Sequence, residues 1–200
     1  MSKNRIKKPR FKECRRLGLN VCGHPKAMKR AKRGTSRADK KLSTYGEQLL
    51  EKQRLRAYYN VSESQFSKYV KDALKSDGNT GDLLIQRLET RLDNLVYRAG
   101  FGSSIRQARQ IVGHGHVLVN GKKVDIASYK VNVGDVITLR ERSKKVEMFV
   151  ENFTATTNAL SYIEKDVDGL SMKLVKTPSR EEVPVQIQDQ LIVEFYSRML

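Results

Sequence analysis

The stretch "SSIRQARQIVGHGHVLVNGKKV", residues 103–124, predicts a short helix that runs directly into a β-hairpin. Ser104 can cap the backbone N–H of Gln107, and Gln107 can reach back to it, which is the capping box typical of a helix start. Apolar residues then recur at spacings of three and four, so one face of the helix is suited to burial. Asn120-Gly121 is the strongest short signal for a hairpin turn, because both residues tolerate positive φ.

Further helices and strands are predicted on both sides of this helix–hairpin frame. Apolar residues at helical spacing predict helices over about 45–59, 62–76 and 82–99, and the last of these carries a row of arginines beside its apolar face. A strand over 136–139, a helix from Val146, a hairpin at Asp168-Gly169 and a C-terminal helix are predicted after it.

These elements predict an α+β protein with a basic extended N-terminal arm. The arm is expected over residues 1–42, an all-helical domain over 43–89 completed by a helix over 188–200, and an α/antiparallel-β domain over 90–187. Prolines and glycines interrupt the arm, and it has no sustained apolar periodicity. Repulsion between its charges should keep most of it open until a counter-charge arrives.

Positive charge is concentrated in the first part of the chain. The net charge is +17, and residues 1–56 hold nineteen Lys and Arg residues against four acids, whereas the rest of the chain is almost balanced. Charge this lopsided indicates a polyanionic partner, either nucleic acid or an anionic membrane surface. The chain has no apolar run long enough to cross a bilayer and no secretory signal at its start, so it is expected to be soluble and intracellular. A mitochondrial transit peptide is the competing interpretation, but the start is rich in Lys and is broken by Pro9.

His114 and His116 lie beside the predicted hairpin and allow three interpretations. A metal site would need a third protein ligand, and no His, Cys or carboxylate cluster elsewhere in the sequence offers one. General acid–base chemistry would need a partner in a cleft, which the sequence does not suggest. The favoured interpretation is that the two rings cover the mouth of the hairpin and donate hydrogen bonds to phosphate or sugar, and a purely structural role is the next alternative.

The two cysteines do not predict a metal site. Cys14 and Cys22 are spaced by seven residues, and with His24 they supply three soft ligands where a closed zinc site uses four. We therefore expect free thiols, no bound metal and no cofactor.

The stretch "RLDNLVYRAGFGSSIRQARQIVGHGHVLVNGKKVDIASYKVNVGD", residues 91–135, resembles the RNA-binding module named after ribosomal protein S-four, here placed over residues 91–142. The module also occurs in tyrosyl-tRNA synthetases and pseudouridine synthases. The helical stretch "YGEQLLEKQRLRAYYNVSESQF" before it and the ending "QLIVEFYSR" resemble the bacterial small-subunit ribosomal protein itself. The arm departs from the family, because "AKRGTSRADKKLS" replaces a Pro-Gly-Gln-His-Gly-like stretch and the four-cysteine zinc knot is missing.

This resemblance implies a structural constituent of the small ribosomal subunit, and not an enzyme. It implies direct binding to small-subunit ribosomal RNA at a helix junction in the 5′ domain, early in assembly, with a contribution to translational accuracy. Neighbouring small-subunit proteins, and messenger RNA along the path by which it enters, are further implied partners. The implied state is a monomer within a cytoplasmic ribonucleoprotein, and some relatives repress their own operon.

Exposed guanidinium and ammonium groups on a rigid frame suit phosphates spaced along an RNA strand, because arginine can make two hydrogen bonds to one phosphate. The candidate RNA-binding residues are Arg10, Lys12, Arg15, Arg16, Lys29, Arg30, Lys32, Arg33, Arg37, Lys40, Lys41, Lys52, Arg54, Arg56, Arg87, Arg91, Ser104, Arg106, Gln107, Arg109, Gln110, His114, His116, Asn120, Lys122 and Lys123.

Three other functions fit parts of the sequence. A stand-alone RNA-binding stress or ribosome-rescue protein could use the same module. An RNA-modifying enzyme would need a catalytic domain, and we find no nucleophile elbow, phosphate-binding glycine loop or synthetase signature. A helix-turn-helix DNA binder would use the helix over 105–112, which is about two turns long and runs into a hairpin, a poor geometry for reading the major groove.

Overall fold

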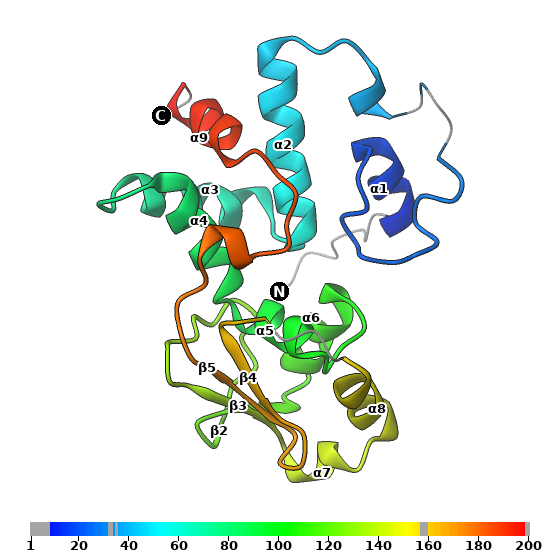
Figure 1. Cartoon of the computed structure of the whole chain (residues 1–200), viewed down its shortest axis with the longest axis vertical. Helices are drawn as coiled ribbons and strands as arrows, with labels where there is room; N and C mark the ends of the chain where they lie inside the picture. The colour runs from blue at the N-terminus through cyan, green and yellow to red at the C-terminus, as the bar shows by residue number, and fades with distance from the viewer. Residues whose placement is uncertain (1–8, 32–33, 35, 157–159, 199–200) are drawn as a thin grey trace. The chain divides into compact units, whose positions relative to one another are not determined.

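A computed structural model of the chain describes residues 9–31, 34, 36–156 and 160–198. The described residues group into two compact units. One contains the residues up to Glu63 and those from Gln186 onward, and the other contains Ser64–Val185. Helices and one antiparallel sheet account for the regular structure of the described residues (Figure 1), which confirms the predicted α+β class.

The first unit is built from helices. Its elements are α1 (Arg10–Leu17), the 3-10 helix η1 (Arg37–Asp39), α2 (Thr44–Tyr58) and α9 (Asp189–Ser197). Helix α9 packs on α2 although the two are far apart in sequence. The side chain of Gln48 donates a hydrogen bond to Glu194 at 2.9 Å, and the backbone N–H of Gln188 donates to Glu51 at 3.1 Å. The C-terminal helix therefore packs within this helical part.

The N-terminal segment differs from the open arm that the sequence suggests. Cys14 and Leu17 of α1 pack with Val21 and Ala27 of the following loop against Leu50 of α2, in a small buried cluster. The left-handed residue that ends α1, Gly18, lies so close to η1 that a Cβ there would meet the Ser36 hydroxyl at 2.6 Å. The described part of the segment is therefore folded. Its apolar residues have no helical periodicity, but they pack against α2.

The second unit combines short helices with a sheet. Its elements are α3 (Glu63–Leu74, which begins at the boundary), α4 (Thr80–Glu89), α5 (Leu92–Ala99), α6 (Ile105–Gly113), β1 (Val117–Val119), β2 (Lys122–Lys123), β3 (Val136–Leu139), α7 (Glu141–Lys144), α8 (Glu147–Ala155), β4 (Ile163–Asp166), β5 (Ser171–Leu174) and the 3-10 helix η2 (Arg180–Glu182). Within the described ranges, no helix has both the length and the apolar character that a bilayer crossing requires.

The prediction of a single helix over 82–99 is wrong, because the helix is interrupted at Thr90 and Arg91, between α4 and α5. Arg91 has an extended backbone, with φ −71° and ψ 140°, and forms an isolated β-bridge with Lys130. The backbone N–H of Leu92 donates to the carbonyl of Tyr129 at 2.9 Å. Bonds to a distant loop therefore replace the helical bonds at this point.

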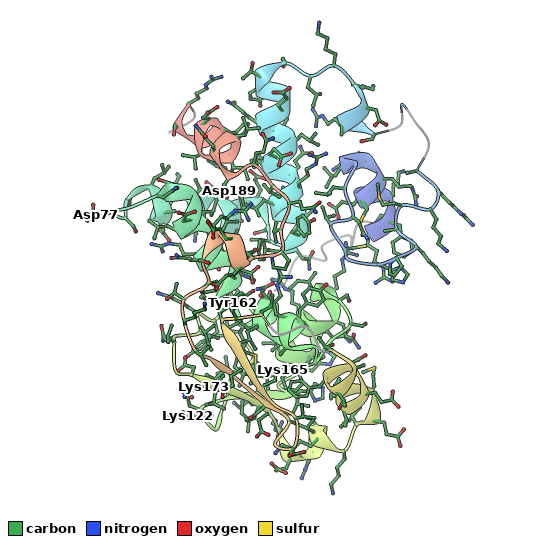
Figure 2. The ribbon with its side chains drawn as sticks, viewed as in Figure 1. Asp77, Lys122, Tyr162, Lys165, Lys173 and Asp189 are labelled. Atoms are coloured by element: carbon green, nitrogen blue, oxygen red, sulfur yellow. The ribbon has the colours of Figure 1, made fainter. Side chains whose placement is uncertain are left out.

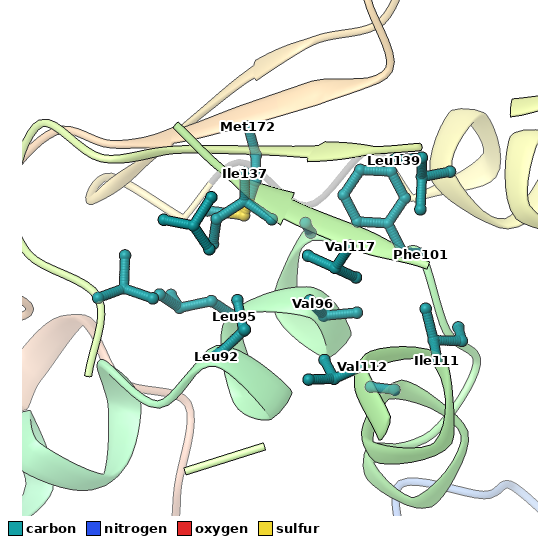
Figure 3. Close-up of a cluster of buried hydrophobic side chains, with 14 of the residues drawn as sticks. Leu92, Leu95, Val96, Phe101, Ile111, Val112, Val117, Ile137, Leu139 and Met172 are labelled. Atoms are coloured by element: carbon teal, nitrogen blue, oxygen red, sulfur yellow. The ribbon is translucent and has the colours of Figure 1, made fainter. Parts of the chain in front are cut away.

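The sheet has the strand order β2-β1-β3-β5-β4, and all neighbouring strands are antiparallel. The predicted hairpin is confirmed, because Leu118 pairs with Lys123 and both Asn120 and Gly121 have positive φ. The predicted start of α6 is also confirmed, since the Ser104 side chain accepts a hydrogen bond from the N–H of Gln107. Figure 3 shows apolar side chains of α5 and α6 packed beneath β1 and β3, so the helix and the hairpin share one core.

Candidate nucleic-acid interface

Helix α6 turns its polar side away from the shared core. Its apolar residues are buried. Arg106 and Arg109 are partly exposed, and Gln110 is exposed. The Nη1 atom of Arg109 lies 3.9 Å from an oxygen of the buried Asp93, so a fixed negative charge attracts this guanidinium. Two arginines at this spacing on a packed helix can meet phosphates of one RNA strand.

Two other candidates on α6 serve the helix itself. Ser104 accepts a hydrogen bond from the N–H of Gln107 at 3.3 Å. The Gln107 amide oxygen accepts bonds from the backbone N–H and the hydroxyl of Ser103, both at 2.7 Å, and its nitrogen lies 3.4 Å from the sulfur of Met148. Ser104 and Gln107 therefore fix the start of α6, and any contact with RNA would compete with these bonds.

The two histidines at the hairpin mouth have different surroundings. His114 is exposed, whereas His116 shares a 2.9 Å hydrogen bond with the Ser143 hydroxyl and packs edge-on against Phe149. Burial lowers the pKa of His116 below its ordinary value, and the charges of His114 and Arg140 lower it further. The His116 ring is therefore neutral near pH 7 and serves the fold, which matches the structural alternative.

The hairpin presents its two lysines at the edge of the sheet. Lys122 and Lys123 are both exposed, and Figure 2 shows Lys122 on the outermost strand. The side chain of Asn120 instead holds the turn, because it donates to Asp135 at 2.8 Å and accepts from the N–H of Val136 at 2.9 Å. The lysines therefore stay in the candidate surface, whereas Asn120 supports it.

Arg140 is absent from the candidates predicted from sequence, and it lies beside the turn formed by His114, Gly115 and His116, the histidine turn. Its Nη1 atom donates to the carbonyl of Gly115 at 3.3 Å, and its backbone N–H donates to the carbonyl of His116 at 2.9 Å. The basic run "LRERSKK" over residues 139–145 is the signal that could have revealed it. The turn thus has a cationic neighbour that is distant in sequence.

Arg91 is wrong as a phosphate ligand, because only 1% of it is exposed. Its guanidinium makes two hydrogen bonds to the Asp93 carboxylate, at 3.0 and 2.7 Å, and a third to the Tyr69 hydroxyl at 2.7 Å. A buried arginine paired in this way supports the fold and offers no surface to a phosphate.

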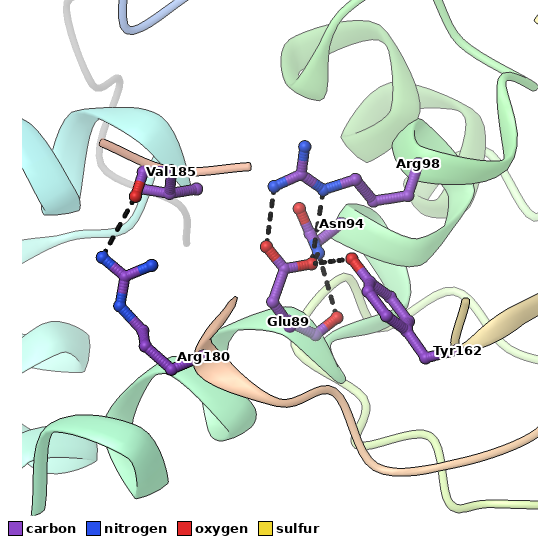
Figure 4. A network of polar contacts seen from close by, with 6 residues as sticks. All are labelled: Glu89, Asn94, Arg98, Tyr162, Arg180 and Val185. Atoms are coloured by element: carbon purple, nitrogen blue, oxygen red, sulfur yellow. Dashed lines mark hydrogen bonds and ion pairs between the residues drawn. The ribbon is translucent and has the colours of Figure 1, made fainter. Parts of the chain in front are cut away.

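The other two arginines of the predicted third helix, Arg87 and Arg98, also make contacts within the second unit. The buried carboxylate of Glu89 accepts hydrogen bonds from Asn94, Arg98 and Tyr162 (Figure 4). The Asn94 amide nitrogen lies 2.6 Å and Arg98 Nη2 lies 2.7 Å from its oxygens. Burial raises the pKa of the Tyr162 phenol, and the nearby Glu89 charge raises it further. Arg87 donates to the Ser76 hydroxyl at 2.8 Å and to the carbonyl of Asp72, so it fastens α4 to the end of α3.

The three basic candidates on α2 are held in ion pairs within the first unit. Lys52 is buried and lies 2.7 Å from Glu63, which also accepts a bond from Arg56 at 2.6 Å. Burial alone would raise the pKa of Glu63, but Lys52, Tyr196 and Arg56 together lower it below its ordinary value. Arg54 pairs with Glu51 and donates to the carbonyl of Leu17. Lys52 is wrong as an RNA contact because it is buried, and the other two could reach RNA only by sharing or leaving these partners.

The N-terminal bases are the most exposed candidates of the first unit. Lys12 and Arg16 project from α1, and the guanidinium of Arg10 lies 5.0 Å from the centre of the Phe11 ring. Lys32 and Arg33 lie outside the described residues. The remaining candidates of this segment are partly exposed at Arg15 and exposed at Lys29, Arg30, Arg37, Lys40 and Lys41.

Within residues 9–31, 34, 36–156 and 160–198, no group of three or more His, Cys, Asp and Glu side chains is arranged to hold a metal ion. Both cysteines are free thiols. Burial and the neighbouring Cys22 raise the pKa of Cys14 to about 11, so its thiol stays protonated at neutral pH.

Comparison with known proteins agrees with this arrangement. Residues 5–89 match the family model described as "Ribosomal protein S4/S9 N-terminal domain", and residues 90–137 match the "S4 domain". The chain is similar to the "Small ribosomal subunit protein uS4B" of Clostridium acetobutylicum, with 56% identity over 95% of this chain and 96% of that protein. It is also similar to the uS4 proteins of Finegoldia magna, at 57% identity over 97% and 99%, and of a Sulfurihydrogenibium species, at 45% over 94% and 97%. Because these relatives match over nearly their whole length, the chain belongs to the uS4 family of small ribosomal subunit proteins.

Proposed function

We propose that this protein binds directly to the ribosomal RNA of the small subunit, at a junction of RNA helices, and nucleates assembly there. The observation that carries the proposal is the cationic surface of the helix–hairpin frame, where Lys122 and Lys123 are exposed and Arg106 and Arg109 are partly exposed. Arg106 and Arg109 of α6 and Lys122 and Lys123 of the hairpin are all fixed to one buried core. A rigid cationic frame of this kind fits phosphates whose positions are set by a folded RNA.

Affinity would come chiefly from the release of counterions. For about six to ten phosphate contacts, binding should fall roughly 10³- to 10⁵-fold between 50 and 200 mM salt. The N-terminal bases would add contacts at low entropic cost, because much of their backbone is already ordered by the cluster around Leu17. Specificity would come from the shape of the RNA more than from base edges.

The proposed role is structural and places the protein in the ribosome, as a monomer among neighbouring small-subunit proteins in the cytoplasm. The relatives' names support this setting. A contribution to translational accuracy and a contact with messenger RNA belong to the same proposal. No catalytic step is assigned to any residue.

The test is a binding titration of the full-length protein with a transcript of the 5′ domain of the small-subunit RNA. Heparin and an unstructured RNA of equal length serve as competitors. We expect tight, steeply salt-dependent binding to the folded transcript and much weaker binding to both competitors. Equal affinity for all three would contradict the shape-based proposal. Crosslinking in cells, with sequencing of the attached RNA, separates ribosomal RNA from the targets of a stand-alone RNA-binding protein or a modifying enzyme.

A further inference from the structure

Gly115 lies against two cationic side chains, Lys123 and Arg140, which come from separate segments of the chain. Its φ is +69°, and a Cβ at this position would lie 2.3 Å from Cε and 3.1 Å from Nζ of Lys123. The Lys123 side chain therefore lies across the glycine. Arg140 reaches the same residue and donates to its carbonyl at 3.3 Å. His114, next to the glycine, is exposed. Only a residue without a side chain permits this close approach.

Helix α7 is fastened to the histidine turn. The backbone N–H of Arg140 donates to the carbonyl of His116, and the His116 ring shares a hydrogen bond with Ser143, each at 2.9 Å. Arg142 lies between these two anchors in the sequence and is exposed. No acidic partner for it is found in the described part of the chain. Its backbone position is therefore set, while its guanidinium faces solvent.

Acidic side chains near the turn neutralise little of this charge. Asp125 lies 3.9 Å from the Lys123 ammonium, and both side chains are more than half exposed, so the attraction is weak. Glu141 pairs with Lys144 at 2.8 Å. The side chains of Lys123 and Arg140 thus leave a net positive charge next to the C-terminal end of α6, and Arg142 adds to it from α7.

We propose that Arg140 and Arg142, together with Lys123, form a second phosphate-binding site around Gly115, which takes the sugar–phosphate backbone of a ribosomal RNA strand. The inference rests on the proposed function and adds a contact from β3 and α7 to those of α6 and the hairpin. The guanidinium groups suit two-pronged hydrogen bonds to phosphate oxygens. Gly115 itself is buried, and its lack of a side chain lets Lys123 and Arg140 lie close together over it.

The test compares Arg142→Ala and the double variant Arg140→Ala/Arg142→Ala with the wild-type protein on the 5′-domain transcript. Each lost phosphate contact should reduce the slope of log affinity against log salt by about one and weaken binding about tenfold. Arg142→Lys should restore most of the slope. Lys173→Ala is the matched control, because Lys173 is an exposed cation of the same unit on β5, on the side of the strand opposite the buried Met172 and Leu174. Thermal melting should show that all variants remain folded.

Nuclease protection of the transcript separates a local contact from a general loss of charge. The proposal predicts that Arg142→Ala loses protection over one short strand and keeps the rest of the footprint. It is overturned if the slope and footprint of Arg142→Ala match those of the wild type, or if Lys173→Ala has the same effect. If the wild-type protein itself does not prefer the transcript to heparin, the proposed function fails, and this site fails with it.

Discussion

Replacement of Arg91 by alanine should distinguish a structural arginine from an RNA-binding one. The substitution leaves the Asp93 carboxylate, which is 1% exposed, without the guanidinium that binds both of its oxygens, and it removes the partner of the Tyr69 hydroxyl. Breaking a buried ion pair by removing one partner costs about 3–5 kcal/mol. Since a domain is stable by only about 5–15 kcal/mol, the second unit should lose a large share of its stability.

The assay is urea denaturation followed by circular dichroism, with RNA binding measured on the protein that remains folded. Arg106→Ala is the matched control, because it removes the same side chain from a partly exposed position of the same unit. We expect Arg91→Ala to lower the free energy of unfolding by about 3–5 kcal/mol with an unchanged salt slope. Arg106→Ala should change the free energy of unfolding by less than about 0.5 kcal/mol and reduce the slope by about one.

A second variant tests the structural role of Arg91 if Arg91→Ala does not fold. The double replacement Arg91→Met/Asp93→Asn removes both charges and should regain part of the lost stability, because no uncompensated charge remains buried. A structural role for Arg91 is refuted if Arg91→Ala costs less than about 1 kcal/mol, or if the variant flattens the salt dependence of RNA binding as Arg106→Ala does.

The other predictions concern packing and protonation. Gly100→Ala should destabilise the second unit in urea by about 1–3 kcal/mol, because its φ is +93° and a Cβ there would lie 2.5 Å from Cβ of Thr156, whereas Gly113→Ala, with open space around it, should be neutral or slightly stabilising. Leu17→Ala should cost the first unit about 2–4 kcal/mol, and an unchanged urea midpoint would mean that the N-terminal cluster does not stabilise α2. His116 should titrate by NMR below its ordinary pKa of about 6.5. Its contribution to stability is therefore complete above that value and is lost as the pH falls through the lowered pKa; a midpoint above 6.5 would contradict its burial.

The sequence alone determined the elements whose causes are local. The Ser104 cap, the Asn120-Gly121 turn and the apolar spacing of α6 each depend on residues a few positions apart, so the helix–hairpin frame could be predicted and its family resemblance seen, although Gln107 reaches back to Ser103 and not to Ser104 as predicted. The distribution of positive charge along the chain could also be predicted, because it depends only on the residue types and not on how the chain folds. The partly exposed bases of α6 and the exposed lysines of the hairpin were therefore identified from sequence, as were the bases of the N-terminal segment.

Only the tertiary structure decided which charged side chains are available to a partner. The partly buried Tyr69, which accepts a hydrogen bond from Arg91, is 22 residues away from it, and Arg54 reaches the carbonyl of Leu17 over 37 residues. The approach of Arg140 to Gly115 spans 25 residues. A sequence pattern records that a residue is charged, but burial and pairing depend on what the folded chain brings beside it. For the same reason the sequence predicts an open arm at the N-terminus, whereas in the structure this segment packs on the apolar surface of α2.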